Sequence, residues 1–352
     1  MRDIFLEVIR WLSTKSVVRE GLESVLERNA ICATPPPSGF AQGGGWSGRG
    51  TCHDAGSPIF ISSRYRSGST LLWRCFREAP GVTAYYEPLN PRKWFDASAR
   101  GTRVDASHRE VQDYWQEYDR LAGCEVPWDD RWPSRDLYLS PCVPARQLKR
   151  YLELLIESAD GRAVLQFNRA DFRLHWLRRA FPQASLVHLH RNPRDQWLST
   201  FIKHAPVPLD AIVKDFQPFD EFYLLPWAAD LRRWFPLFSE IDDLHPYELS
   251  YLISRMSLVY GQNFSDISIA YEDLVAQSRE TLRSLGDAVG IPNFNQIALV
   301  DSIDARSVGR WRDYADDDWF AVREERMESI LQQCLFWDPT QECGSMEMGA
   351  GE

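Results

Sequence analysis

Residues 58–79, PIFISSRYRSGSTLLWRCFREA, contain the pattern that decides the fold. The run PIFISS (58–63) is short and apolar, which is typical of a strand covered on both faces. The apolar spacing of LLWRCFREA (71–79) predicts a helix, so the loop RYRSGST joins a strand to a helix N-terminus. Such a loop directs backbone N–H groups and the positive end of the helix dipole at one point, which predicts an anion-binding site.

Further apolar runs predict the rest of a sheet, and they alternate with helical patterns. The predicted strands are VTAYY (82–86), AVLQF (163–167), SLVHLH (185–190) and DISIAY (266–271). This alternation indicates an α/β fold of three layers, with a mostly parallel sheet flanked by helices. Two regions, near 95–160 and 207–263, interrupt the alternation, and we expect both to be helical inserts that cover the ligand edge of the sheet.

The length of 352 residues fits one α/β domain with appendages. Residues 1–32 are expected to form an amphipathic helical extension, and the Pro- and Gly-rich segment 33–56 a linker. The main domain is then expected over 57–338, with a flexible tail over 339–352.

Net charge limits the classes of partner. Asp and Glu number 50 against 40 Lys and Arg, a net charge of −10, which argues against nucleic acid or an anionic membrane held by bulk attraction. Any anionic ligand therefore needs a local pocket. The seven cysteines are scattered without a C-x-x-C pair, so we expect neither a disulfide framework nor a zinc site.

The loop after the first predicted strand differs from the ATP-binding pattern G-x-x-x-x-G-K-[ST]. Gly68 and Thr70 match it, but Ser63 replaces the first glycine and Ser69 replaces the lysine. A cation, Arg66, lies two residues before Gly68 and is expected to reach the terminal group of the anion. The other loop residues expected to hold the anion are Ser67, Gly68, Ser69 and Thr70.

A second anion site is predicted in HLHRNPRDQWLSTF (188–201). Arg191 follows an apolar strand, Pro193 suits the first position of a helix, and Ser199 is expected about two turns into that helix. The carboxyl end of a strand is where ligands bind in open α/β sheets. We therefore expect Arg191 to hold a second phosphate by charge and Ser199 to hold it by its hydroxyl.

Together these two motifs resemble the sulfotransferases that use 3′-phosphoadenosine 5′-phosphosulfate (PAPS). The resemblance implies that the RSGST loop binds the 5′-phosphosulfate and that Arg191 and Ser199 bind the 3′-phosphate. AYEDL (270–274) is similar to the family's Y-E-D-L strand end. SVGRWRDY (307–314) is similar to its late loop, which implies that Arg306 and Arg310 close over the nucleotide. The similarity extends over residues 57–338.

Sulfuryl transfer to a hydroxyl needs a base for the acceptor's proton and a cation for the leaving phosphate. Cytosolic aryl and steroid members of the family use a histidine, but Arg169 occupies the position that looks equivalent. The segment YEPL (86–89) is similar to that of carbohydrate and protein-tyrosine members, which implies Glu87 as the catalytic base. Arg66 is then the catalytic cation, and no metal is required.

The resemblance implies a hydroxyl-bearing acceptor, such as a sugar, a glycolipid or another metabolite, and it leaves a homodimer open. Golgi relatives carry a membrane anchor; none is evident here, so we expect a cytoplasmic enzyme. One alternative is a P-loop kinase-like phosphotransferase, for which Asp273 is the candidate magnesium ligand. Another is a non-catalytic module that binds the nucleotide without chemistry. His108, in the first insert, is expected to be solvated.

Overall fold

The computed structural model describes residues 56–334 except 106–107, 109–110 and 304–306, so nearly all of the predicted N-terminal extension, linker and tail lies outside it. The described chain forms a five-stranded parallel sheet in the order β2-β3-β1-β4-β5. The strands are β1 (Ile59–Ser63), β2 (Val82–Tyr86), β3 (Arg162–Phe167), β4 (Ser185–His190) and β5 (Ile267–Ala270).

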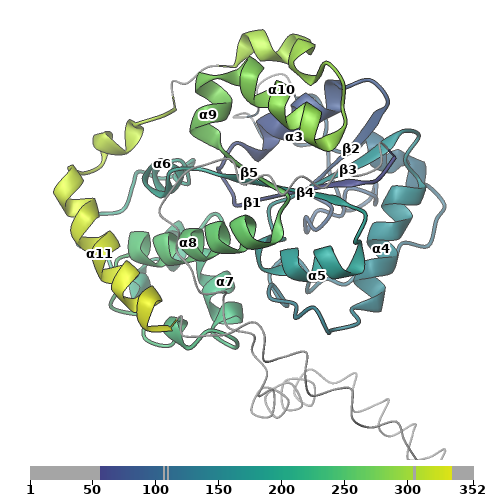
Figure 1. Cartoon of the computed structure of the whole chain (residues 1–352). Helices are drawn as coiled ribbons and strands as arrows, with labels where there is room; N and C mark the ends of the chain where they lie inside the picture. The colour runs from purple at the N-terminus through teal and green to yellow at the C-terminus, as the bar shows by residue number, and fades with distance from the viewer. Residues whose placement is uncertain (1–55, 106–107, 109–110, 304–306, 335–352) are drawn as a thin grey trace, which may run out of the picture.

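Helices cover both faces of this sheet, as Figure 1 shows: α3, α9 and α10 lie on one face, and α4, α5 and α8 on the other. The prediction of a three-layer α/β fold with a parallel sheet is thereby confirmed. The α-helices are α3 (Ser69–Glu78), α4 (Arg146–Glu157), α5 (Leu174–Ala180), α6 (Pro193–Leu198), α7 (Leu224–Leu231), α8 (Pro246–Phe264), α9 (Tyr271–Ala276), α10 (Ser278–Val289) and α11 (Asp317–Cys334).

The central strand β1 is flanked by β3 and β4, and every one of its residues is buried. A strand enclosed in this way needs an uninterrupted apolar run, because both of its faces pack against helices. The carboxyl ends of β1 and β4 therefore lie side by side, with Ser63 opposite Leu189 in the parallel register. The sheet itself places the two predicted anion-binding segments next to each other.

The region 207–263 is only in part the insert over the ligand edge of the sheet that its sequence suggested. Helix α8 begins at Pro246, where the His245 ring and the Glu248 carboxylate form a reciprocal capping box. It then packs along the sheet as the crossover between β4 and β5, so closely that a Cβ on Gly261 would lie 2.0 Å from the His188 ring. The expectation of an insert over 246–263 was therefore wrong, since a parallel pair of strands needs a crossover here.

The first insert does cover the edge of the sheet. Beyond β2 it runs through irregular chain and the 3₁₀ helix η1 (Gln116–Leu121) before α4. The ring of Tyr114 stacks on that of Tyr86 at the end of β2, with 4.5 Å between centroids. Trp94 packs on both rings and is 3% exposed, so its indole is part of the packing of this cover.

A buried histidine makes stability depend on pH. His175 lies among the rings of Tyr138, Tyr260 and Phe264, and within the described chain neither of its ring nitrogens has a hydrogen-bond partner. Burial lowers the pKa of His175 from 6.5 to about 3. Below pH 6.5 the unfolded chain binds a proton at this residue that the folded chain does not bind, so the free energy of unfolding falls as the pH falls toward 3.

We expect His175→Phe to reduce this slope, because the ring that replaces the imidazole cannot titrate. At pH 5 the single histidine lowers the free energy of unfolding by about 2 kcal/mol relative to pH 7.5. Urea unfolding at the two pH values measures the difference, with the exposed His204→Phe as the matched control. Equal slopes in the wild type and in His175→Phe would show that His175 is not responsible.

Candidate active site

The loop between β1 and α3 takes a shape that only glycine permits at its tip. Gly68 has φ of +91° and caps the N-terminus of α3. A Cβ on this residue would lie 2.2 Å from the ring of Tyr271, so both backbone conformation and space exclude a side chain. Arg66 also lies in the left-handed region, with φ of +63°. The loop is therefore a tight turn that brings the backbone close to whatever lies above it.

The two predicted anion-binding segments meet directly. The Nε of Arg66 donates to the carbonyl of Ser199 at 2.8 Å, and Nη1 of Arg191 donates to the carbonyl of Arg66 at 3.0 Å. Helix α6 ends at Leu198, so Ser199 caps its C-terminus and does not lie inside the helix as the sequence suggested. The Ser199 hydroxyl donates to the Gln196 carbonyl at 2.8 Å.

Two further segments with family-like sequence join this cluster. The Tyr271 hydroxyl lies 2.8 Å from Oγ of Ser307, and Nη2 of Arg191 donates to the Ser307 carbonyl at 2.7 Å. The Arg191 guanidinium lies over the Tyr271 ring, 4.6 Å from its centroid. The four segments that carried the sequence resemblance, far apart in the chain, are thus one connected cluster.

Asp195 fixes the late loop, and sequence reasoning missed it. Its carboxylate accepts the backbone N–H of Gly309 at 2.7 Å and that of Trp311 at 3.0 Å, and it is 2% exposed. Its place in RNPRD, one turn after Arg191, was the only available signal. The anchor of this loop is therefore an acidic side chain.

The structure describes only one of the two arginines that were predicted to contact the nucleotide from the late loop. Arg306 lies outside the described residues. Arg310 is 64% exposed at its side chain and lies 3.5 Å from the Asp313 carboxylate on the surface of the 3₁₀ helix η8 (Arg310–Asp313). In this arrangement Arg310 points its charge at an acidic neighbour, so its assignment to the nucleotide stays a prediction.

Glu87 is held rigidly beside the loop. It is buried, has φ of +41°, and forms an ion pair with Arg169 at 2.9 Å. Asn90 donates to its Oε2 at 2.7 Å, and Asn168 donates to its Oε1. The guanidinium of Arg169 lies over the ring of Tyr65, 4.9 Å from the centroid. The carboxylate thus has a fixed orientation and a compensated charge at the ends of β2 and β3.

His108 is not the solvated side chain that its sequence suggested. Its Nε2 lies 3.2 Å from the hydroxyl of Thr70, and its Nδ1 lies 2.5 Å from that of Tyr114. The Thr70 hydroxyl also lies 3.1 Å from that of Tyr86. Burial lowers the pKa of His108, which favours the neutral ring. The first insert is therefore hydrogen-bonded to the loop after β1.

The site is electrostatically suited to an anion. Burial lowers the pKa of both Arg66 and Arg191, because a desolvated guanidinium loses hydration of its charge. Among the described residues the buried Nε of Arg191 has no hydrogen-bond partner. An incoming phosphate oxygen would supply that partner and restore the favourable environment of the charge. Ser67, Gly68, Ser69 and Thr70 follow in one turn at the N-terminus of α3.

Comparison with known proteins decides the family. A sequence model described as the sulfotransferase family matches residues 58–296, about two thirds of the chain. The chain belongs to the sulfotransferase family. This sulfotransferase has no significant match among curated proteins. In its described part no helix is both long and apolar enough to cross a membrane.

Solved structures that resemble this sulfotransferase carry the same family name. The sulfotransferase domain of the Synechococcus PCC 7002 olefin synthase is 18% identical, with a TM-score of 0.39 over 82% of this chain and 98% of that one. A domain from the curacin biosynthetic pathway is 14% identical, with a TM-score of 0.42 over 78% and 97%. A sulfotransferase of Mycobacterium avium is 15% identical, with a TM-score of 0.41 over 80% and 76%.

We expect Asp195→Ala to release the late loop, because the N–H groups of Gly309 and Trp311 lose their acceptor. One buried and one half-buried backbone donor then lack a partner, which lowers the free energy of unfolding by about 1–3 kcal/mol. Amide hydrogen exchange at Gly309 and Trp311 should accelerate. Asp313→Ala, in the same loop, is the control, because its carboxylate is exposed. Unchanged protection of both amides in Asp195→Ala would contradict the anchoring role.

Proposed function

We propose that the protein transfers the sulfuryl group of PAPS to a hydroxyl of a carbohydrate or other small-molecule acceptor. The observation that carries the proposal is the convergence of two half-buried arginines, Arg66 and Arg191, on one turn at a helix N-terminus. A donor with phosphates at both ends of its ribose presents two anionic groups, which fits two cationic positions on adjacent strands.

The residues near the turn divide between the two phosphates. Backbone N–H groups and hydroxyls of the loop would hold the 5′-phosphosulfate, with the Arg66 guanidinium at the transferring end. Arg191 and Ser199 would hold the 3′-phosphate, the arginine through its unpartnered Nε. Arg306 and Arg310 would close over the nucleotide. The residues of the loop after β1 that would hold the 5′-phosphosulfate are Ser67, Gly68, Ser69 and Thr70.

Glu87 is proposed as the base. Among the described residues, one hydrogen bond reaches its Oε1 and two reach Oε2, so Oε1 keeps a lone pair for the acceptor hydroxyl. The acceptor oxygen attacks sulfur in line as its proton passes to Glu87. The bond from sulfur to the phosphate oxygen breaks, and 3′-phosphoadenosine 5′-phosphate (PAP) leaves with its new negative charge near Arg66.

The phosphotransferase alternative has weaker support. It requires a lysine at the position of Ser69 to reach the outer phosphates of a nucleotide. The hydroxyl of serine carries no charge, and the cation of this loop, Arg66, precedes the glycine. Asp273, the candidate magnesium ligand, lies within α9.

Binding of PAP tests the donor assignment. We expect PAP to bind more tightly than adenosine 5′-phosphate, and we expect Arg191→Ala to reduce this preference at least tenfold through loss of a charge-assisted contact. Isothermal titration of both nucleotides measures it. The ratio of the two affinities is insensitive to general damage, and the exposed Arg283→Ala serves as the control. An unchanged ratio in Arg191→Ala would remove the assignment of the 3′-phosphate site.

Turnover tests the base. With labelled PAPS and a panel of hydroxyl acceptors, we expect Glu87→Gln to lower kcat by at least about 100-fold, the usual effect of losing a general base, with PAP affinity retained. Because Glu87→Gln leaves the Arg169 charge buried and unpaired, the double variant Glu87→Gln, Arg169→Gln should regain stability but not turnover. Turnover restored in the double variant would assign Glu87 a structural role only.

A further inference from the structure

Arg64 is a buried cation that the proposed nucleotide site does not use. It follows β1 directly, is 8% exposed, and lies with its guanidinium 4.9 Å from the ring centroid of Trp227. In the described part of the chain its Nε and Nη1 have no hydrogen-bond partner, and it forms no ion pair. Burial lowers the pKa of Arg64 to about 10, which leaves the side chain charged at neutral pH.

The acidic groups that attract Arg64 form no direct ion pair with it. Oδ1 of Asp171 accepts a hydrogen bond from the Ser62 hydroxyl at 2.5 Å, whereas its Oδ2 has no hydrogen-bond partner among the described residues. Asp220 accepts the backbone N–H groups of Leu224 and Leu225 at 2.8 Å each. A guanidinium buried without direct partners destabilises a fold by several kcal/mol. An anion beside the guanidinium would compensate this buried charge.

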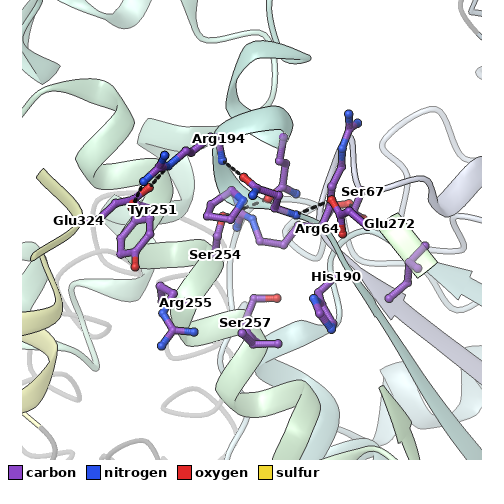
Figure 2. A pocket seen from close by; sticks show the side chains of 16 residues that line it. Arg64, Ser67, His190, Arg194, Tyr251, Ser254, Arg255, Ser257, Glu272 and Glu324 are labelled. Atoms are coloured by element: carbon purple, nitrogen blue, oxygen red, sulfur yellow. Dashed lines mark hydrogen bonds and ion pairs between the residues drawn. The ribbon is translucent and has the colours of Figure 1, made fainter. Parts of the chain in front are cut away.

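A cavity of about 500 Å³ lies against this side chain. Figure 2 shows Arg64 on one wall, at the start of the loop after β1, and side chains of α8 on the opposite wall. Four arginines line the cavity against two glutamates, so its lining is net positive: Arg64, Arg191, Arg194 and Arg255 against Glu272 and Glu324. The volume is that of a pocket for a small organic molecule.

Other arginines of the lining are committed to protein partners. Arg194 forms ion pairs with Glu324 and Asp317, and Arg255 pairs with Glu328 at 2.5 Å. Burial lowers the pKa of His190 to about 3, so its ring is neutral. Arg64 is therefore the lining arginine that, within the described chain, has neither a carboxylate partner nor a role in the proposed nucleotide site.

We propose that this cavity is a second anion-binding site, in which Arg64 binds a tetrahedral oxyanion, the phosphate or sulfate group of a small molecule. The Arg64 guanidinium supplies a fixed positive charge and N–H donors that suit the oxygens of such an anion. The two sites adjoin, because Ser67 and Arg191 also line the cavity. Gly68 packs on Tyr271 and Thr70 contacts the first insert, whereas the cavity extends from Arg64 to α8. The site goes beyond the proposed sulfuryl transfer and does not depend on it.

The test titrates inorganic phosphate, inorganic sulfate and acetate into the full chain, with and without saturating PAP. We expect phosphate or sulfate to bind in the presence of PAP and acetate to bind more weakly, with the stronger of the first two naming the anion. Arg64→Met should lower that affinity at least tenfold, the loss expected for a charge-assisted hydrogen bond. The oxyanion affinity of Arg64→Lys should fall between those of the wild type and Arg64→Met. The affinity of the exposed Arg283→Met should match that of the wild type.

Two controls separate a ligand role from a structural one. In anion-free buffer Arg64→Met should have an equal or higher melting temperature, because it removes an unpaired buried charge, and its PAP affinity should equal that of the wild type. Displacement of phosphate and sulfate by PAP, or a loss of PAP affinity in Arg64→Met or Arg64→Lys, would assign the cavity to the nucleotide site and overturn the proposal. So would equal oxyanion affinity in wild type and both variants. Failure of PAP to bind would count against the proposed function alone.

Discussion

The guanidinium of Arg191 joins the segments on which the site depends. It donates to the carbonyls of Arg66 and Ser307 and lies over the ring of Tyr271, so it contacts the loop after β1, the start of α9 and the late loop. Lysine could not replace it, because an ammonium lacks both the planar fork and the face that stacks on an aromatic ring. Its position follows from the sheet, since β4 pairs directly with β1.

The same dependence on strand register explains the Glu87 ion pair. Tyr86 lies opposite Gln166 in the parallel pairing of β2 with β3, so the residues just beyond, Glu87 and Asn168 with Arg169, emerge together. The position at which cytosolic relatives are expected to carry a histidine therefore holds a partner of the carboxylate. A buried ion pair adds little net stability, but removal of either charge is costly. The pair fixes where Glu87 points more than it strengthens the fold.

The sequence predicted the strands well and the side-chain network poorly, for different physical reasons. Strands at 82–86 and 185–190 have their predicted limits, because buried parallel strands need continuous apolar runs. Helix α6 ended early because the hydroxyls of Ser199 and Thr200 bond to carbonyls three residues before them, a local competition that hydrophobic spacing does not report.

Residues that act through distant partners left no such pattern. The contacts of Asp195 with Gly309 and Trp311 span more than 110 residues, and that of His108 with Thr70 spans 38. Each residue type is common on a surface, so neither could be singled out before the sheet order was known. The loop residues from Ser67 to Thr70 could be found because strand, turn and helix follow one another without a gap, and a local motif needs no knowledge of the fold.

The arginines also differ in role, and their contacts show this where the residue type alone does not. Five of the 40 basic residues are lysines, so 35 are arginines, and an arginine in a motif carries little information by itself. The hydrogen-bond and ion-pair partners of each guanidinium distinguish the arginines from one another. Arg173 is buried but donates to the carbonyls of Trp132, Arg135, Asp136 and Arg169, which makes it a structural crosslink. Arg310 is exposed beside an acidic neighbour.

Arg191 and Arg64 differ from both, because each has a buried N–H group that no described residue accepts. A buried donor without a partner is unfavourable for a cation, whereas one with a carbonyl partner is not, so at these two arginines we propose that a ligand's charge completes the structure. A chain of net charge −10 can hold anionic ligands on this basis. The proposed attraction would arise from a few desolvated guanidinium groups, which act over short distances, and charges on the surface more than about 10 Å away would be screened by salt.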